Sequence, residues 1–260
     1  MHPTLLHLGH FVLPTFGVLA AAGLMLALSL SLRTAALVRV DPEALWNAGL
    51  FAIVSALVSS RLLLIFSNFK SFLDYPLIIL ALPSLTATGI LLTLIATLFY
   101  LRLKRLALLA VLDAWAPCAT LAWGFLALGH FAEGSDPGLP TALPWKILSP
   151  TGGAYLHPIA LYAALAAAIL SAAAYLYLRQ PRQPGQAIAF TLAAVGVTQF
   201  LLTFLRHPSF ASDISPVFNV LDPIQWVSLG MVLAASVLYI QTVPITLQSQ
   251  PVETPEHHAL

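Results

Sequence analysis

Charged residues are scarce in this sequence of 260 residues. Asp, Glu, Lys and Arg together make up 8% of the chain, whereas soluble domains carry about 25%. So few charged residues cannot cover the surface of a water-soluble globular protein. A disordered chain is excluded as well, because disorder requires low hydrophobicity and high charge. The 11 basic and 10 acidic residues nearly balance, so the chain lacks the basic field that binding to nucleic acid requires.

Cysteine is almost absent as well, since Cys118 is the only one in the sequence. A single cysteine excludes a disulfide framework and a cysteine-based zinc site. Apolar residues, in contrast, make up 59% of the chain. Together these shares indicate a multi-pass membrane protein built as one domain.

Long apolar stretches predict an all-α integral membrane fold, a bundle of seven transmembrane helices. A helix needs about 20 mostly apolar residues to cross the bilayer, and helices are expected because every backbone polar group in lipid must be paired within its segment. The seven stretches are residues 12–32, 45–66, 76–101, 113–131, 155–178, 186–206 and 221–242.

Lysine and arginine are distributed unevenly among the connections between these spans. The first, third and fifth connections carry Arg33, Arg39, Arg102, Lys104, Arg105, Arg179 and Arg182. The second, fourth and sixth carry only Lys70 and Lys146, with Arg206 at a helix end. Because basic loops remain in the cytoplasm, the N-terminus is predicted outside and the C-terminus inside. Residues 1–243 would form the membrane domain and residues 244–260 a disordered cytoplasmic tail.

Acidic residues and prolines mark the starts of several predicted helices. Asp41 with Pro42 is expected to open the second helix, the acid as its cap and the proline at the first helical position. Asp113 is expected to open and cap the fourth helix. Pro76 and Pro223 are expected to begin the third and the seventh.

The longest connection between predicted spans is residues 132–154, referred to below as the outer loop. It contains glycines and prolines but also Leu139, Leu143, Trp145 and Leu148. A loop with this apolar content is expected to lie on or in the outer leaflet. Because loops of this length are often functional, it is predicted to face the substrate.

Ionisable side chains near the outer ends of the spans are the best pointers to function, because burying them without a partner is costly. If the helices pack together, one layer would contain Arg61, His130, Glu133, His157 and Arg206. An arginine in this layer would bind a lipid phosphate through paired hydrogen bonds. The alternative is that each side chain simply extends to the lipid headgroups.

The histidines of this region do not form a recognisable metal motif. His130, His157 and His207 occur together with Glu133, but no HExxH pattern is present and the spacing is not diagnostic. Neither a metal nor a cofactor is predicted.

Several short motifs occur in order along the chain. They are residues 113–117 (DAWAP), 138–145 (GLPTALPW), 157–162 (HPIALY), 206–208 (RHP) and 225–228 (QWVS). This ordered set resembles the prolipoprotein diacylglyceryl transferase family, in which the second and third motifs have the patterns G-R-P-T-x-L-P-W and H-P-x-Q-L-Y-E. The resemblance implies a multi-pass enzyme of the bacterial inner membrane that moves diacylglyceryl from phosphatidylglycerol to the lipobox cysteine of a prolipoprotein.

The predicted site combines the ionisable layer with landmarks of the resemblance. His130, Glu133 and His157 are predicted to be the catalytic residues because they cluster in that layer. Arg61, Arg206, Tyr162 and Gln225, which lie at landmark positions, are predicted to bind the lipid and its phosphate.

The chain departs from the family pattern at several polar positions. Ala127, Leu139 and Gln199 occupy positions where the family has arginine, and Ser135 replaces a glutamate. The alternative function is therefore that of a catalytically degenerate relative, which binds lipid or serves as a structural subunit of a membrane complex. The alanine-rich segment 163–168 would suit contact with such a partner.

Overall fold

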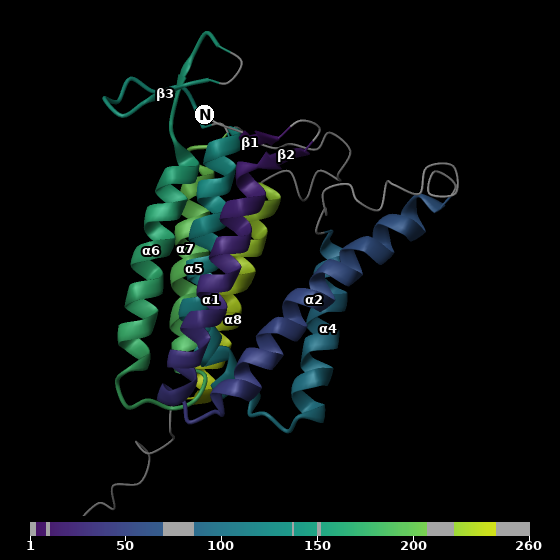
Figure 1. The fold of residues 1–260 in the computed structure, drawn as a ribbon. Coiled ribbons are helices and arrows are strands. Elements are labelled where there is room, and N and C mark those ends of the chain that lie inside the picture. Colours follow the sequence, from purple (N-terminus) through teal and green to yellow (C-terminus); the bar gives the residue numbers. More distant parts are fainter. Residues whose placement is uncertain are drawn as a thin grey trace, which may run out of the picture.

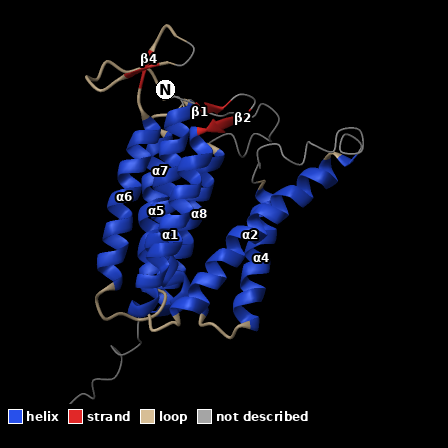
Figure 2. Cartoon of the chain, viewed as in Figure 1, coloured by secondary structure: helices blue, strands red, loops and turns tan. Residues whose placement is uncertain are grey.

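The computed structural model describes residues 4–8, 11–69, 86–136, 138–149, 152–206 and 221–242. Helices dominate this part of the chain (Figures 1 and 2): α1 (Thr15–Leu37), α2 (Pro42–Ser67), α4 (Ala87–Leu103), α5 (Leu108–Glu133), α6 (Ile159–Leu178), α7 (Gln186–Thr203) and α8 (Pro223–Thr242). Two antiparallel pairs of strands accompany them: β1 (Thr4–Leu8) with β2 (Phe11–Pro14), and β3 (Ile147–Leu148) with β4 (Tyr155–Leu156). The first predicted span, which began at residue 12, therefore starts a few residues too early.

Six of the described helices are long and apolar enough to cross a membrane, namely α1, α2, α5, α6, α7 and α8. The observed helix α4 has 17 residues and is also apolar. It covers the second half of the predicted third span. Residues 76–85, the tail 244–260, Lys70 and His207 lie outside the described residues.

Many large apolar side chains point away from the protein, as expected for a surface that faces lipid. On α2, Leu57 and Leu62 are 50% and 49% exposed, and on α4 Phe99 is 64% exposed. Scattered apolar residues are normal on soluble proteins, but runs of this kind mark a membrane-facing surface. The chain is thus a helical integral membrane protein.

Among the described residues, α1, α5, α6, α7 and α8 form a bundle, and the pair α2 and α4 leans away from it (Figure 1). Helix α5 lies at the centre and packs against α1, α6 and α7, while α8 packs against α7. Helices α2 and α4 pack on each other, and α2 also contacts α1. In Figure 1 the pair meets the bundle at the end opposite the outer loop and diverges from it toward the other end.

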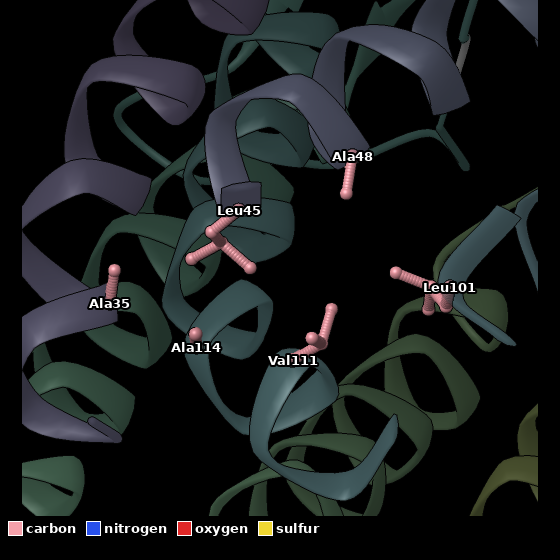
Figure 3. Close-up of a cluster of buried hydrophobic side chains, with 6 residues drawn as sticks. All are labelled: Ala35, Leu45, Ala48, Leu101, Val111 and Ala114. Atoms are coloured by element: carbon pink, nitrogen blue, oxygen red, sulfur yellow. The ribbon is translucent and has the colours of Figure 1, made fainter. Parts of the chain in front are cut away.

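A cluster of small and branched apolar side chains joins the pair to the bundle (Figure 3). Its members are each at most 2% exposed and come from α1, α2, α4 and α5: Ala35, Leu45, Ala48, Leu101, Val111 and Ala114. In lipid, helices associate through close van der Waals packing, which small side chains permit. This cluster fixes where α2 and α4 are anchored.

Two of the predicted helix starts are confirmed. Asp41 caps α2 by accepting a hydrogen bond from the amide of Ala44 at 2.9 Å, and Pro42 is the first helical residue. Helix α8 begins at Pro223, as expected.

The predicted start and cap at Asp113 were wrong. Helix α5 begins five residues earlier, at Leu108, and has no side-chain cap. Asp113 is instead buried, and its carboxylate accepts hydrogen bonds from the amides of Gly185 at 2.6 Å and Ile188 at 2.8 Å. The first-turn amides of a helix have no partner within it, and Gly185, the N-cap of α7, has no side chain to offer. Asp113 therefore caps α7 from a neighbouring helix.

The alanine-rich face of α6 packs inside the protein. Ala163 and Ala167 are 2% and 0% exposed, and Ala167 lies against Gly124 of α5. Ser171, one turn further along α6, donates a hydrogen bond to the carbonyl oxygen of Pro117 at 2.8 Å. The small residues thus allow α6 to approach α5 closely, whereas Ala168 of the same segment is exposed. Contact of this segment with a partner stays a prediction.

Candidate functional site

The outer loop is bound to the ends of α6 and α7 through backbone hydrogen bonds. The amide of Leu139 donates to the carbonyl of Leu205 at 2.8 Å, and the amide of His157 donates to the carbonyl of Leu139 at 3.0 Å. Strand β3 of the outer loop pairs with β4, which directly follows the loop, in a short antiparallel hairpin. Figure 1 shows this hairpin extending beyond the ends of the helices. These contacts bring the segment before α6 and the segment after α7 to one end of the bundle, called the loop end below.

Gly138 is required for this close approach. A Cβ atom added there would lie 2.5 Å from the carbonyl oxygen of His157 and 2.8 Å from its Cβ. Both distances are shorter than real Cβ contacts allow. Any larger residue would separate the loop from the segment that carries His157.

Arg206 forms an ion pair with Asp136 of the outer loop. The distance from Nη2 to Oδ2 is 2.8 Å, and each side chain is 23% exposed. The Nε atom of Arg206 is buried and has no hydrogen-bond partner among the described residues. Charge-assisted pairs of this kind are stronger than neutral hydrogen bonds, so the pair both holds the loop and orients the guanidinium.

A hydrogen-bonded chain of aromatic residues links the loop to α6. The indole Nε1 of Trp145 donates to the hydroxyl of Tyr162 at 2.6 Å, and the same oxygen lies 3.4 Å from Nδ1 of His157. Because the Tyr162 oxygen accepts the indole proton, its own proton is free to point toward His157. The predicted residues His157 and Tyr162 are thus brought together.

His130 and Glu133 lie on the last turn of α5, at the same end. Nδ1 of His130 is 2.9 Å from the hydroxyl of Ser135, and the imidazole packs on the ring of Phe16. Glu133 is partly buried and forms no ion pair with any described residue. Within the described part of the chain, no group of three His, Cys, Asp or Glu side chains is arranged to hold a metal ion.

Arg61 lies in the last turns of α2, whose packing partners are α4 and α1. Figure 1 shows that end of α2 diverging from the bundle that carries the other four residues of the predicted layer. The grouping of Arg61 with them in one layer stays a prediction.

Gln225 has a structural role at the start of α8. Its Oε1 accepts a hydrogen bond from the amide of Asp222 at 3.0 Å, and the Asp222 carboxylate accepts one from the amide of Ile224 at 2.9 Å. This reciprocal pattern is similar to a capping box, with the Asp222 carboxylate bonded to the second helical amide instead of the third. Gln225 lies beside an apolar cavity, because its neighbours Ile224, Val227 and Ser228 line that cavity.

An apolar cavity of about 380 Å³ lies between α5, α7 and α8. Most of the side chains in its wall are apolar, among them Trp115, Trp123, Leu192 and Met231. Gln199 is a polar exception, and its Oε1 is buried without a hydrogen-bond partner among the described residues. A cavity with this lining suits a hydrocarbon chain carrying a polar group at one end.

The cavity extends along the bundle from Leu112 and Ile188, near the opposite end, to Trp123 and Ile224 on the side of the loop end. Trp123 lines the cavity and also packs against a buried cluster that includes Ala127, Ile159 and Leu202, on which Tyr162 and Leu205 pack as well. Ala127, at which the family pattern has arginine, is therefore enclosed by apolar side chains.

The sequence did not predict three hydrogen-bond partners at the loop end. These are Ser135 for His130, Asp136 for Arg206 and Trp145 for Tyr162. The signal for Asp136 was available, since an arginine at an apolar helix end needs a counter-charge and this acid lies in the longest connection predicted on that side. The partners of His130 and Tyr162 had no comparable signal.

The fold and this site define a class: a multi-pass helical membrane protein in which a polar layer at one end adjoins an apolar cavity. The model of a known family, described as prolipoprotein diacylglyceryl transferase, matches residues 3–241. The chain belongs to this family.

Curated relatives agree with the assignment. A phosphatidylglycerol–prolipoprotein diacylglyceryl transferase of Photobacterium profundum is 27% identical over 91% of this chain and 89% of its own length. One of Aliivibrio fischeri is 29% identical over 89% and 84%. One of Bordetella parapertussis is 34% identical, but there the similarity spans 59% of each chain.

Proposed function

We propose that the protein binds phosphatidylglycerol at the loop end and transfers its diacylglyceryl group to the cysteine of a prolipoprotein, as its relatives are named for doing. The observation that carries this proposal is the polar layer at the loop end beside an apolar cavity of about 380 Å³. One part suits an anionic headgroup and the other an acyl chain, and a phospholipid has both.

The reaction requires a phosphate-binding group and a proton acceptor. The thiol sulfur of the substrate cysteine attacks the glyceryl carbon, a carbon–sulfur bond forms, and the bond from that carbon to the phosphate oxygen breaks. The leaving glycerol phosphate is negative, so Arg206 is assigned to it and Arg61 to the lipid on its way in. The thiol proton passes to a base of the layer formed by His130, Glu133 and His157.

Two further residues would shape the lipid site. Tyr162 holds His157 and the loop through its hydroxyl, and Gln225 lies between cavity-lining residues at the start of α8. We assign both to lipid binding.

The test is a transfer assay with purified protein, phosphatidylglycerol and a lipobox peptide. Thioether product is expected from the unaltered protein, and Arg206→Gln is expected to lower the rate by about 100- to 1,000-fold, as loss of one anion-stabilising donor commonly does. His157→Gln should reduce the rate as well. Arg33→Gln, which removes a charge from an exposed position of α1, is the matched control and should leave the rate unchanged. Absence of product from folded protein would contradict the proposal.

A second candidate function is lipid binding without transfer. It is favoured by the apolar cluster around Ala127, because a buried alanine there leaves no cation where the family pattern has one. In this case phosphatidylglycerol would co-purify with the protein while the assay gives no product. The protein would then act as a lipid-binding or structural subunit of a membrane complex, and affinity purification from mild detergent would recover its partners.

We further propose that the protein lies in a bacterial inner membrane, which it crosses seven times with the N-terminus outside. Residues 1–243 would form the membrane domain, and residues 244–260 a disordered cytoplasmic tail. The uneven distribution of lysine and arginine supports this orientation. Cysteines introduced singly at Trp145 and Arg182 test it in spheroplasts. A membrane-impermeant maleimide should label the first and not the second, and the reverse pattern would contradict the orientation.

A further inference from the structure

A second, strongly basic cavity lies at the end of the bundle opposite the loop end. It has a volume of about 500 Å³ and lies between the end of α1, the start of α5 and the connection from α6 to α7. Three arginines line it: Arg39, Arg179 and Arg182. None of the residues assigned above to diacylglyceryl transfer belongs to it.

The positive charge of this cavity is not neutralised by the described residues. None of them places a carboxylate at ion-pair distance from Arg39, Arg179 or Arg182. Asp113 also lines the cavity, but both of its carboxylate oxygens accept hydrogen bonds from the amides at the start of α7. The cavity therefore carries a net positive charge.

The arginines are positioned by local structure. Arg39, which follows the C-cap Val38 of α1, has a left-handed backbone conformation with φ of 57°. The Arg182 guanidinium lies 3.5 Å above the ring of Tyr177 and donates a hydrogen bond to Gln180 at 2.7 Å. Stacking and hydrogen bonding of this kind orient a guanidinium before a ligand arrives, which favours the recognition of a phosphate group.

Apolar residues lie beside these charges. Leu37, Val38 and Leu178 line the same cavity at the ends of α1 and α6, where membrane helices meet the headgroup region. A free anion would gain nothing from these side chains, whereas a phospholipid would bury its glycerol and upper acyl carbons against them. Basic pockets between transmembrane helices are typical sites for acidic headgroups.

We propose that this cavity binds the phosphate of an anionic phospholipid from the leaflet opposite the loop end, as a site separate from the one used for diacylglyceryl transfer. Arg39, Arg179 and Arg182 surround the phosphate, and the apolar residues contact the glycerol. The bound lipid would join α1 to the connection between α6 and α7, whose position is otherwise set by Asp113.

The test compares two triple variants that lose the same charge. One is Arg39→Gln, Arg179→Gln and Arg182→Gln. The control variant carries Arg33→Gln, Arg102→Gln and Arg105→Gln, which replace three arginines that do not line the cavity. Among them, Arg105 matches Arg39 because both have a left-handed backbone conformation. Delipidated full-length protein is titrated with dioleoylphosphatidylglycerol, and bound lipids are counted by native mass spectrometry.

The cavity variant is expected to bind one lipid fewer than the control, with affinity at that site weakened by about 100-fold, because each basic residue near an acidic headgroup contributes about a factor of five. Lipid at the loop end adds equally to both variants and cancels in the comparison. Equal lipid counts in two folded variants, as judged by their thermal unfolding, would overturn the proposal. Displacement of the extra lipid by millimolar inorganic phosphate would overturn the assignment to a phospholipid.

Discussion

Replacing Asp113 should destabilise the protein more than replacing any exposed helix cap, because the carboxylate bridges two helices. It accepts two hydrogen bonds from backbone amides of α7, at 2.6 and 2.8 Å, while being only 4% exposed. Asp113→Ala leaves the Gly185 and Ile188 amides without this acceptor. Gly185 is itself buried, so water cannot readily replace the lost partner.

The magnitude follows from these contacts. A hydrogen bond to a charged group contributes about 1.5–3 kcal/mol net, and the Ile188 amide, being only partly buried, recovers some of its loss from water. We therefore expect Asp113→Ala to lower the free energy of unfolding by about 3–4 kcal/mol. Asp113→Asn keeps the size of the side chain and one acceptor oxygen, and should cost less.

Asp41→Ala is the matched control, since Asp41 is an exposed cap with one hydrogen bond to Ala44. An exposed cap contributes about 1 kcal/mol. Unfolding of the purified protein by SDS in mixed micelles, followed by circular dichroism, measures both variants on one scale. Equal losses for Asp113→Ala and Asp41→Ala would refute the conclusion that Asp113 stabilises the contact between α5 and α7.

Two other substitutions test the docking of the outer loop. Gly138→Ala should lower the free energy of unfolding by about 1–3 kcal/mol, the usual cost of overpacking, and expose the outer loop to proteases. Gly230→Ala is the control and should have neither effect, because the added Cβ meets nothing within 4 Å. Tyr162→Phe removes the acceptor of the Trp145 indole and should cost about 1 kcal/mol, whereas Tyr239→Phe on an exposed face should change stability by less than about 0.5 kcal/mol. Equal protease sensitivity of the two glycine variants, or equal stability of the two tyrosine variants, would contradict the loop contacts.

The sequence by itself determined the class of the protein and most helix boundaries. Predicted spans such as 186–206 and 221–242 match α7 (Gln186–Thr203) and α8 (Pro223–Thr242) closely. The physical reason is that a helix in lipid satisfies its own backbone, so the length of an apolar run and a local cap such as Asp41 suffice to define it. The placement of His130, Glu133, His157 and Arg206 at one end follows in the same way, from their positions along their own helices.

Only the tertiary structure decided which side chains become partners. Asp113 and Gly185 are 72 positions apart in the chain, and Asp136 and Arg206 are 70 apart, so these contacts depend on how helices distant in sequence pack. The same packing leaves the two cavities open. Apolar periodicity carries no information about such choices, because in a membrane both the lipid-facing and the buried sides of a helix are apolar.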